Sequence, residues 1–141
     1  MHQELLKVKM FGGFELLYRG EPVVLERGKA TKATQLLQYF LFHKDQKISR
    51  DELLHALYEW DEDINPVNNL KVNIYRLRKL LAELLSSDQE YISFQGGKYY
   101  WSNAIPVEID TELFKETVAQ FEEAAGDSER RIELAQQILV L

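Results

Sequence analysis

The residues best suited to chemistry lie in one basic stretch near the middle of the chain. Residues 66–82 contain four bases and no acid. They also repeat asparagine, which is a poor helix former and unexpected on a merely solvated helix. Asparagine can pair with adenine, arginine with guanine and a valine methyl with the thymine methyl, so this mixture suits base edges in a major groove. The bases are Lys71, Arg76, Arg78 and Lys79, and the asparagines are Asn68, Asn69 and Asn73.

A helix over residues 67–85 would sort these side chains by face. At roughly 100° per residue, Leu70, Ile74, Leu77 and Leu81 fall within a narrow arc and are predicted to be the buried seam. Lysine and tyrosine at the margins of the other face suit phosphates. A solvated helix face is the alternative interpretation of the same residues. The face opposite the seam carries Asn68, Asn69, Val72, Tyr75, Arg76 and Lys79, with Lys71, Asn73 and Arg78 on its flanks.

Shorter elements are predicted before and after this helix. The first 25 residues alternate short apolar runs with turn residues, which indicates a small antiparallel sheet of three or four strands. Apolar spacing predicts a helix over residues 29–43, and Ser49 with Glu52 forms a capping-box pattern that begins a second helix reaching Tyr58. Residues 91–101 read as a hairpin in which Gly96 and Gly97 supply the positive φ angles of a two-residue turn.

The pattern changes after Pro106. Asp110 is predicted to cap a helix that reaches residue 125, and Ser128 to cap another that is still apolar where the sequence stops. An apolar helix end with nothing after it predicts a truncated domain. We expect residues 1–105 to form one domain and residues 106–141 to begin a second, helical one.

Charge divides along the chain in the same way. The net charge is −6, with 23 acids and 17 bases. Nine acids and three bases follow residue 105, so the first 105 residues carry 14 of each. Because binding to DNA depends on local charge, the acidic total does not exclude it. The acidic segment, in contrast, is predicted not to contact DNA.

Several classes of function are excluded by what the sequence lacks. We find no glycine-rich phosphate loop, no nucleophile with a partnered base and no metal-ligand spacing among the three histidines, so we predict no enzyme, no cofactor and no metal site. The sequence has no cysteine, no secretory signal and no apolar run long enough for a membrane span. A cytoplasmic protein without membrane contact is expected.

The order of these motifs resembles a known family. The string NNLKVNIYRLRKLL, preceded by SRDELLHALYEWDEDINP and followed by a Gly-Gly hairpin ending in KYYW, is similar to the OmpR/PhoB-type winged helix of response regulators. Within that group the chain most resembles the SARP-type regulators, which join such a domain to a bacterial transcriptional activator domain (BTAD) of helical, TPR-like repeats. The likeness extends over nearly the whole chain. It includes the opening VKMFGGFELLYRGEPVVLERGKATKATQLLQYFLFH and the segment VEIDTELFKETV, which resembles the start of the second domain of those regulators.

The resemblance implies an α+β fold, a winged helix-turn-helix, in which a small sheet, three helices and a wing hairpin precede a helical hairpin. It implies sequence-specific binding of double-stranded DNA by a bacterial transcription regulator, most simply an activator, with copies associating on direct repeats. The alternative is a winged helix that binds protein and does not read DNA. Bases would be met by Asn69, Val72, Asn73 and Arg76, and the DNA backbone by Arg50, Tyr58, Asn68, Lys71, Tyr75, Arg78 and Lys79.

Two regions remain open at this stage. The wing residues Gln95, Gly96, Gly97 and Lys98 depart from relatives that place arginine before the turn, which leaves the contact with the minor groove undefined. The loop before the basic helix is acidic, and in relatives this loop can touch RNA polymerase. A solvated loop is the simpler interpretation of its acids, which are Glu59, Asp61, Glu62 and Asp63.

Overall fold

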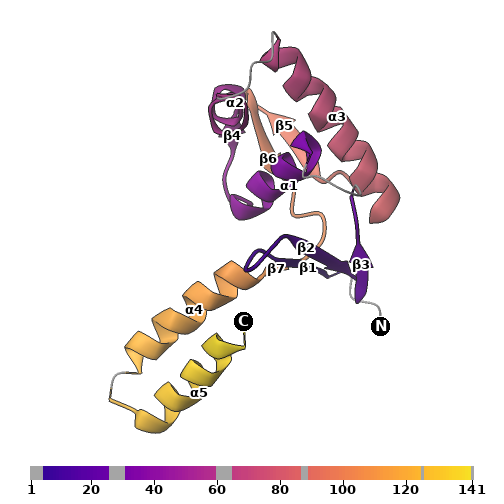
Figure 1. Ribbon diagram of the computed structural model, residues 1–141. Helices are drawn as coiled ribbons and strands as arrows, with labels where there is room; N and C mark the ends of the chain where they lie inside the picture. Colours follow the sequence, from indigo (N-terminus) through magenta and orange to yellow (C-terminus); the bar gives the residue numbers. More distant parts are fainter. Residues whose placement is uncertain (1–4, 26–30, 60–64, 87–88, 125, 141) are drawn as a thin grey trace. The chain divides into compact units, whose positions relative to one another are not determined.

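A computed structural model describes residues 5–25, 31–59, 65–86, 89–124 and 126–140. The chain divides into two compact units (Figure 1). One comprises Met1–Val23 with Ile105–Leu141, and the other comprises Val24–Ala104. We call them the sheet–hairpin unit and the three-helix unit. The mixture of small sheets and helices confirms the predicted α+β class.

The three-helix unit contains the predicted helices and hairpin. Its three strands form an antiparallel sheet in the order β4-β6-β5. The two strands of the hairpin are joined by a two-residue turn, with Gln95 opposite Lys98. The elements are α1 (Lys32–Phe42), β4 (Ile48–Ser49), α2 (Arg50–Tyr58), α3 (Pro66–Leu84), β5 (Ile92–Gln95) and β6 (Lys98–Trp101).

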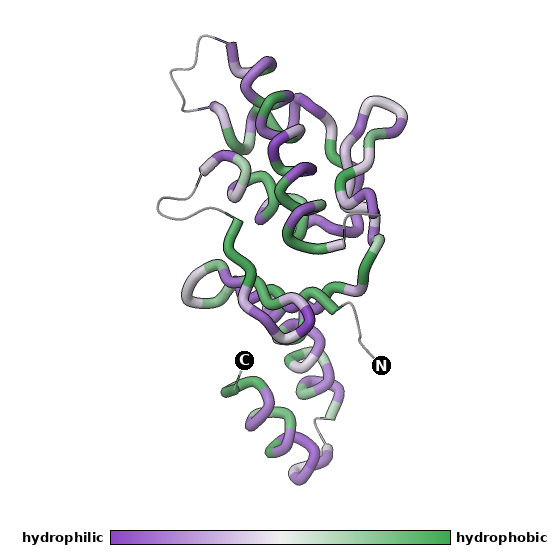
Figure 2. The backbone as a smooth tube through the Cα atoms, turned by 90° about the vertical axis from the view of Figure 1, so that its right-hand side faces the viewer, coloured by the Kyte–Doolittle hydropathy of each residue, from purple (hydrophilic) through white to green (hydrophobic). Residues whose placement is uncertain are grey.

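The core of this unit comes from one apolar side of each element. The seam predicted on α3, Leu70, Ile74, Leu77 and Leu81, is buried. Helix α1 adds five buried residues at helical spacing, and the sheet adds Trp101. Apolar and polar residues alternate along the helices (Figure 2), as expected when one face of a helix is buried. The core residues of α1 are Ala33, Leu36, Leu37, Phe40 and Leu41.

The sheet–hairpin unit holds a four-stranded sheet in the order β3-β2-β1-β7. The first three strands are antiparallel, as predicted. The fourth strand, β7, was not predicted. It begins directly after Pro106 and pairs in parallel with β1, with Leu6 opposite Val107. A fully antiparallel sheet is therefore wrong for this unit. The strands are β1 (Leu6–Lys9), β2 (Glu15–Tyr18), β3 (Glu21–Val23) and β7 (Val107–Ile109).

Asp110 has a different role from the helix cap that we predicted. It is the first residue of α4 (Asp110–Glu123), whose N-terminus has no side-chain cap. Its carboxylate instead accepts hydrogen bonds from the backbone N–H groups of Met10 at 2.9 Å and Phe11 at 3.1 Å. Asp110 is buried, and its carboxylate is satisfied by these two N–H groups, which come directly after the end of β1. The aspartate thus connects the start of α4 to the segment after β1.

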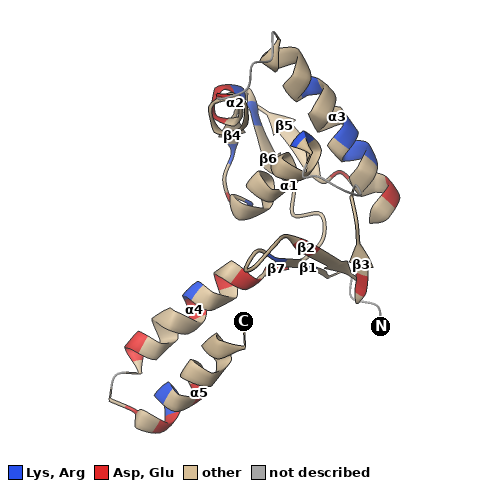
Figure 3. Ribbon diagram, in the orientation of Figure 1, with Lys and Arg blue, Asp and Glu red and all other residues tan. Residues whose placement is uncertain are grey.

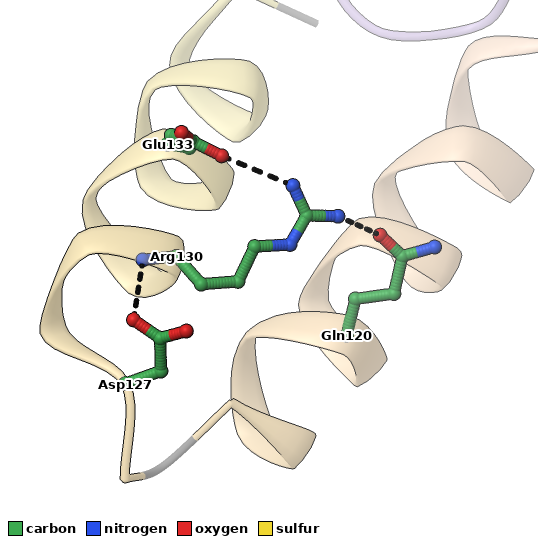
Figure 4. Close-up of polar contacts among 4 residues, drawn as sticks. All are labelled: Gln120, Asp127, Arg130 and Glu133. Atoms are coloured by element: carbon green, nitrogen blue, oxygen red, sulfur yellow. Dashed lines mark hydrogen bonds and ion pairs between the residues drawn. The ribbon is translucent and has the colours of Figure 1, made fainter.

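The second helix of the C-terminal hairpin is α5 (Ser128–Leu139). Its cap is Asp127, one residue before the predicted Ser128, and the Asp127 carboxylate accepts from the N–H of Arg130 at 3.1 Å. The Arg130 side chain donates to Glu133 at 3.1 Å and to Gln120 of α4 at 3.5 Å (Figure 4). These contacts join the two helices.

The predicted boundary between a first domain of residues 1–105 and a second, helical domain stays a prediction.

Candidate nucleic-acid interface

Helix α3 begins where local chemistry favours a helix start. The Asn65 side chain accepts from the N–H of Asn68 at 3.1 Å, and Pro66 occupies the first helical position, where its missing N–H costs nothing. Burial of the leucine and isoleucine seam then fixes which face is outward. The packing of this seam therefore turns the polar face of the helix outward.

The outward face of α3 combines cations with exposed apolar groups. Val72 and Tyr75 are 55% and 59% exposed, and Arg76 and Lys79 are exposed beside them. The Lys79 ammonium lies 5.1 Å from the centre of the Tyr75 ring. In Figure 3 the ribbon of α3 carries the blue of basic residues along its length and the red of an acidic residue only near its C-terminal end. Positive charge thus surrounds a small apolar spot, as a major-groove surface requires.

Asn69 and Asn73 are held in a polar cluster and are only half-exposed. The Tyr58 hydroxyl donates to Asn69 Oδ1 at 2.7 Å. Asn73 Nδ2 donates to the same Oδ1 at 2.8 Å and to the Asn69 backbone carbonyl at 2.9 Å, and it lies 3.4 Å from the Tyr58 hydroxyl. Tyr58 itself is 5% exposed. Nothing in this geometry supports the phosphate contact predicted for Tyr58.

Arg78 connects the helix to the wing. Its Nε donates to the backbone carbonyl of Ile92 in β5 at 3.1 Å, and the residue is half-buried. This hydrogen bond holds α3 against the first strand of the wing hairpin. The contact with the DNA backbone predicted for Arg78 would have to use its remaining guanidinium N–H groups.

A groove lies between the start of α2, the side of α3 and the wing. Ser49 caps α2 by accepting from the N–H of Glu52 at 3.1 Å, as predicted, while the Glu52 carboxylate accepts from Tyr39 at 3.2 Å. Free amides at a helix start favour an anion, and exposed cations add to that preference. The groove has a volume of about 510 Å³ and is lined by Ser49, Arg50, Asp51, Lys71, Phe94, Gly97 and Tyr99.

The wing turn has the backbone that its two glycines predicted. Gly96 and Gly97 have φ angles of 60° and 79°, in the left-handed region that side chains disfavour. No atom of the described residues lies within 4 Å of the position of a Cβ at either glycine, so the requirement is conformational. Gln95 and Lys98 are exposed on either side of the turn.

Comparison with known proteins identifies this arrangement. Residues 21–100 match the family model described as "Transcriptional regulatory protein, C terminal". The chain belongs to this family. Its members carry the OmpR/PhoB-type winged helix and bind DNA, so the chain contains the DNA-binding domain of a transcription regulator.

The fold also matches that of a solved regulator. Mycobacterium tuberculosis EmbR, a SARP-family regulator solved in complex with a low affinity phosphopeptide, has a TM-score of 0.74 and 20% identity to this chain. The match covers 95% of this chain and 35% of EmbR. At this identity the likeness concerns the fold, which confirms the predicted winged helix with a following helical hairpin. A search of the curated proteins finds no match.

Two features of this winged helix were missed from sequence. Phe94, in the first wing strand, is 54% exposed, and its ring lies 4.6 Å from that of Tyr99 on the groove wall. Phe94 lies two residues after the buried Ile92 on the same strand, so the sequence suggests that it is buried too. The core ends before the wing tip, and Phe94 is therefore exposed. Lys32 lies with its ammonium 4.6 Å from the centre of the Tyr58 ring and donates to the Leu57 carbonyl.

Of the four acids in the loop that can touch RNA polymerase in relatives, the structure describes Glu59 alone. Glu59 is exposed and lies 3.5 Å from His55 on the preceding helical turn. Asp61, Glu62 and Asp63 lie outside the described residues. Across the described ranges there is no cluster of three or more metal-ligating side chains, and no helix has the length and apolar character needed to cross a membrane.

Proposed function

We propose that this chain reads the sequence of duplex DNA with the outward face of α3 in the major groove. The observation that carries the proposal is the exposed pair Val72 and Arg76, set among exposed cations on a helix whose opposite side is fully buried. Valine suits the thymine methyl and arginine suits the two acceptors of guanine. The partly exposed amides of Asn69 and Asn73 lie on the same side and complete the base-facing set.

The DNA backbone would follow the groove beside α3. Arg50 and Lys71 line this groove, together with the start of α2 and the wing. An anion there meets the positive end of a helix as well as two cations. Asn68, Tyr75, Lys79 and the free N–H groups of Arg78 provide further phosphate contacts along α3. The wing residues Gln95 and Lys98 lie at the tip, where the neighbouring minor groove would pass.

We further propose that the regulator activates transcription and that copies associate on direct repeats. Residues 106–141 begin a helical interaction domain, and the acidic loop around Glu59 is the candidate contact for RNA polymerase. These assignments rest on the likeness to SARP-type regulators and on the acidic, two-helix character of the C-terminal segment.

Salt dependence of binding to a duplex obtained by selection from random sequence tests the proposal. Each phosphate neutralised contributes a slope of about −0.9 to log K against log salt, so the four cations Arg50, Lys71, Arg78 and Lys79 give a slope of roughly −3 to −4. A winged helix that docks on protein would bind its partner with little salt dependence and would select no duplex. Failure to enrich any sequence from the random pool would contradict the proposal.

A further inference from the structure

The polar cluster of Tyr58, Asn69 and Asn73 determines which atoms the two asparagines can offer to a base. The donor and acceptor roles in the cluster are set by the Asn69 backbone carbonyl, which can only accept a hydrogen bond. Asn73 must therefore turn its nitrogen toward that carbonyl, and Nδ2 lies 2.9 Å from it. The amide has two hydrogens, and the second is directed at Asn69 Oδ1, 2.8 Å away. Both donors of Asn73 are then used.

Asn69 is fixed by the same sequence of bonds. Because Asn73 offers it a hydrogen, Asn69 must present oxygen, and Tyr58 must act as donor to the second lone pair, at 2.7 Å. An amide oxygen has two lone pairs, so Asn69 Oδ1 is fully used as well. What remains is Asn69 Nδ2, with two donors, and Asn73 Oδ1, with its lone pairs.

The Tyr58 hydroxyl is itself held in place. Tyr58 is 5% exposed, with the Lys32 ammonium over its ring. Lys32 is anchored by its bond to the Leu57 carbonyl at the end of α2. One acceptor site of an amide on α3 is thus occupied from α2, by a side chain that is almost fully buried.

We infer that this cluster restricts Asn69 to donating and Asn73 to accepting, with Tyr58 taking the last acceptor site of Asn69 Oδ1, so that neither forms the two-bond pair with adenine that asparagine makes elsewhere. That pair needs one donor and one acceptor from the same amide. Asn69 then prefers guanine or thymine, which present acceptors and no amino group in the major groove, and Asn73 prefers cytosine or adenine, which present an amino group there. Tyr58 is a positioning residue and touches no base. The inference rests on the proposed function, since it concerns how the same face reads DNA.

The test is selection of duplexes from a random pool by the whole chain and by Tyr58→Phe. The base pair facing Asn69 is first located as the one whose preference Asn69→Ala removes. Tyr58→Phe keeps the ring and deletes the hydroxyl, which releases one lone pair of Asn69 Oδ1. Adenine at that position should rise about threefold to tenfold relative to the parent, which is the effect of one hydrogen bond. Tyr39→Phe, which removes a hydroxyl bonded to Glu52 elsewhere in the unit, is the matched control and should leave the profile unchanged.

A second variant keeps the inference testable where Tyr58→Phe does not fold. Asn69→Asp preserves both internal acceptor bonds and replaces only the outward donor by an acceptor. The preferred base at that position should change from guanine or thymine to cytosine or adenine, while total affinity falls because a negative charge faces DNA. Adenine as the parent's preferred base facing Asn69, or an unchanged preference in both variants, overturns the inference. A parent that selects no sequence at all refutes the proposed function instead.

Discussion

Arg76 and Lys79 lie one turn apart on α3 and would serve DNA in different ways. Both are exposed on the face opposite the buried seam. An arginine can form two bonds to guanine and so distinguish one base from another, whereas a lysine at the margin provides a charge that any sequence satisfies. Their individual effects therefore separate base reading from charge neutralisation.

Arg76→Ala should lower affinity for the selected duplex by about 1–3 kcal/mol and relax the preference at one base pair. Lys79→Ala should weaken binding to selected and random duplexes equally and reduce the salt slope by roughly 1. Fluorescence anisotropy on both duplexes over a range of salt concentrations measures the two effects. Equal losses on both duplexes for Arg76→Ala would show that it does not read a base.

At the scale of elements, one aspartate connects segments that lie far apart in sequence. Asp110 begins α4, yet it satisfies two N–H groups of the segment that follows β1. Bonds to a carboxylate are stronger than bonds between neutral groups, and here the carboxylate is buried. The sheet–hairpin unit thus depends on the bonds between Asp110 and the segment after β1, as well as on the parallel pairing of β1 with β7.

Asp110→Ala should lower the free energy of unfolding by about 1–3 kcal/mol, since it leaves the N–H groups of Met10 and Phe11 without their acceptor. Glu116→Ala, an exposed acid on the same helix, should change it by less than about 0.5 kcal/mol. Chemical denaturation followed by circular dichroism gives both values. Equal stability of the two variants would mean that the Asp110 bonds contribute nothing net.

For the whole molecule, the division of charge has a consequence for DNA binding. The acidic excess lies after residue 105, while the basic face belongs to α3. An acidic segment that does not contact DNA will be indifferent to small changes in its own charge, because salt screens charges beyond about 10 Å.

Replacing both Glu122 and Glu123, which are exposed on α4, by glutamine should leave DNA affinity within about twofold of the parent at 0.1 M salt. Were these helices to lie along the duplex, removing two negative charges would strengthen binding several-fold. Titration of the selected duplex with both proteins distinguishes the two cases.

Assembly on DNA is tested by spacing. If two copies occupy direct repeats about 10–10.5 base pairs apart, both lie on one face of the duplex. Inserting five base pairs between the repeats turns the second copy to the opposite face and should abolish cooperative binding while single-site affinity is unchanged. Cooperativity that survives the insertion would rule out contact between neighbouring copies.

The seam of α3, the start of α2 at Ser49 and the glycine turn of the wing were all predictable, because helical periodicity, capping and positive φ are properties of a few neighbouring residues. The candidate face of α3 followed from the seam by geometry alone. Its individual base and phosphate contacts stay predictions.

The strand β7 and the role of Asp110 were not predictable, since each joins residues about 100 positions apart and has no local signature. The same reason applies to Asn69 and Asn73. Their positions on α3 follow from helical spacing, but the amide atoms left available to DNA depend also on a hydroxyl brought from α2 by packing. Hydrogen-bond polarity passes from atom to atom in space, and only the folded chain brings those atoms together.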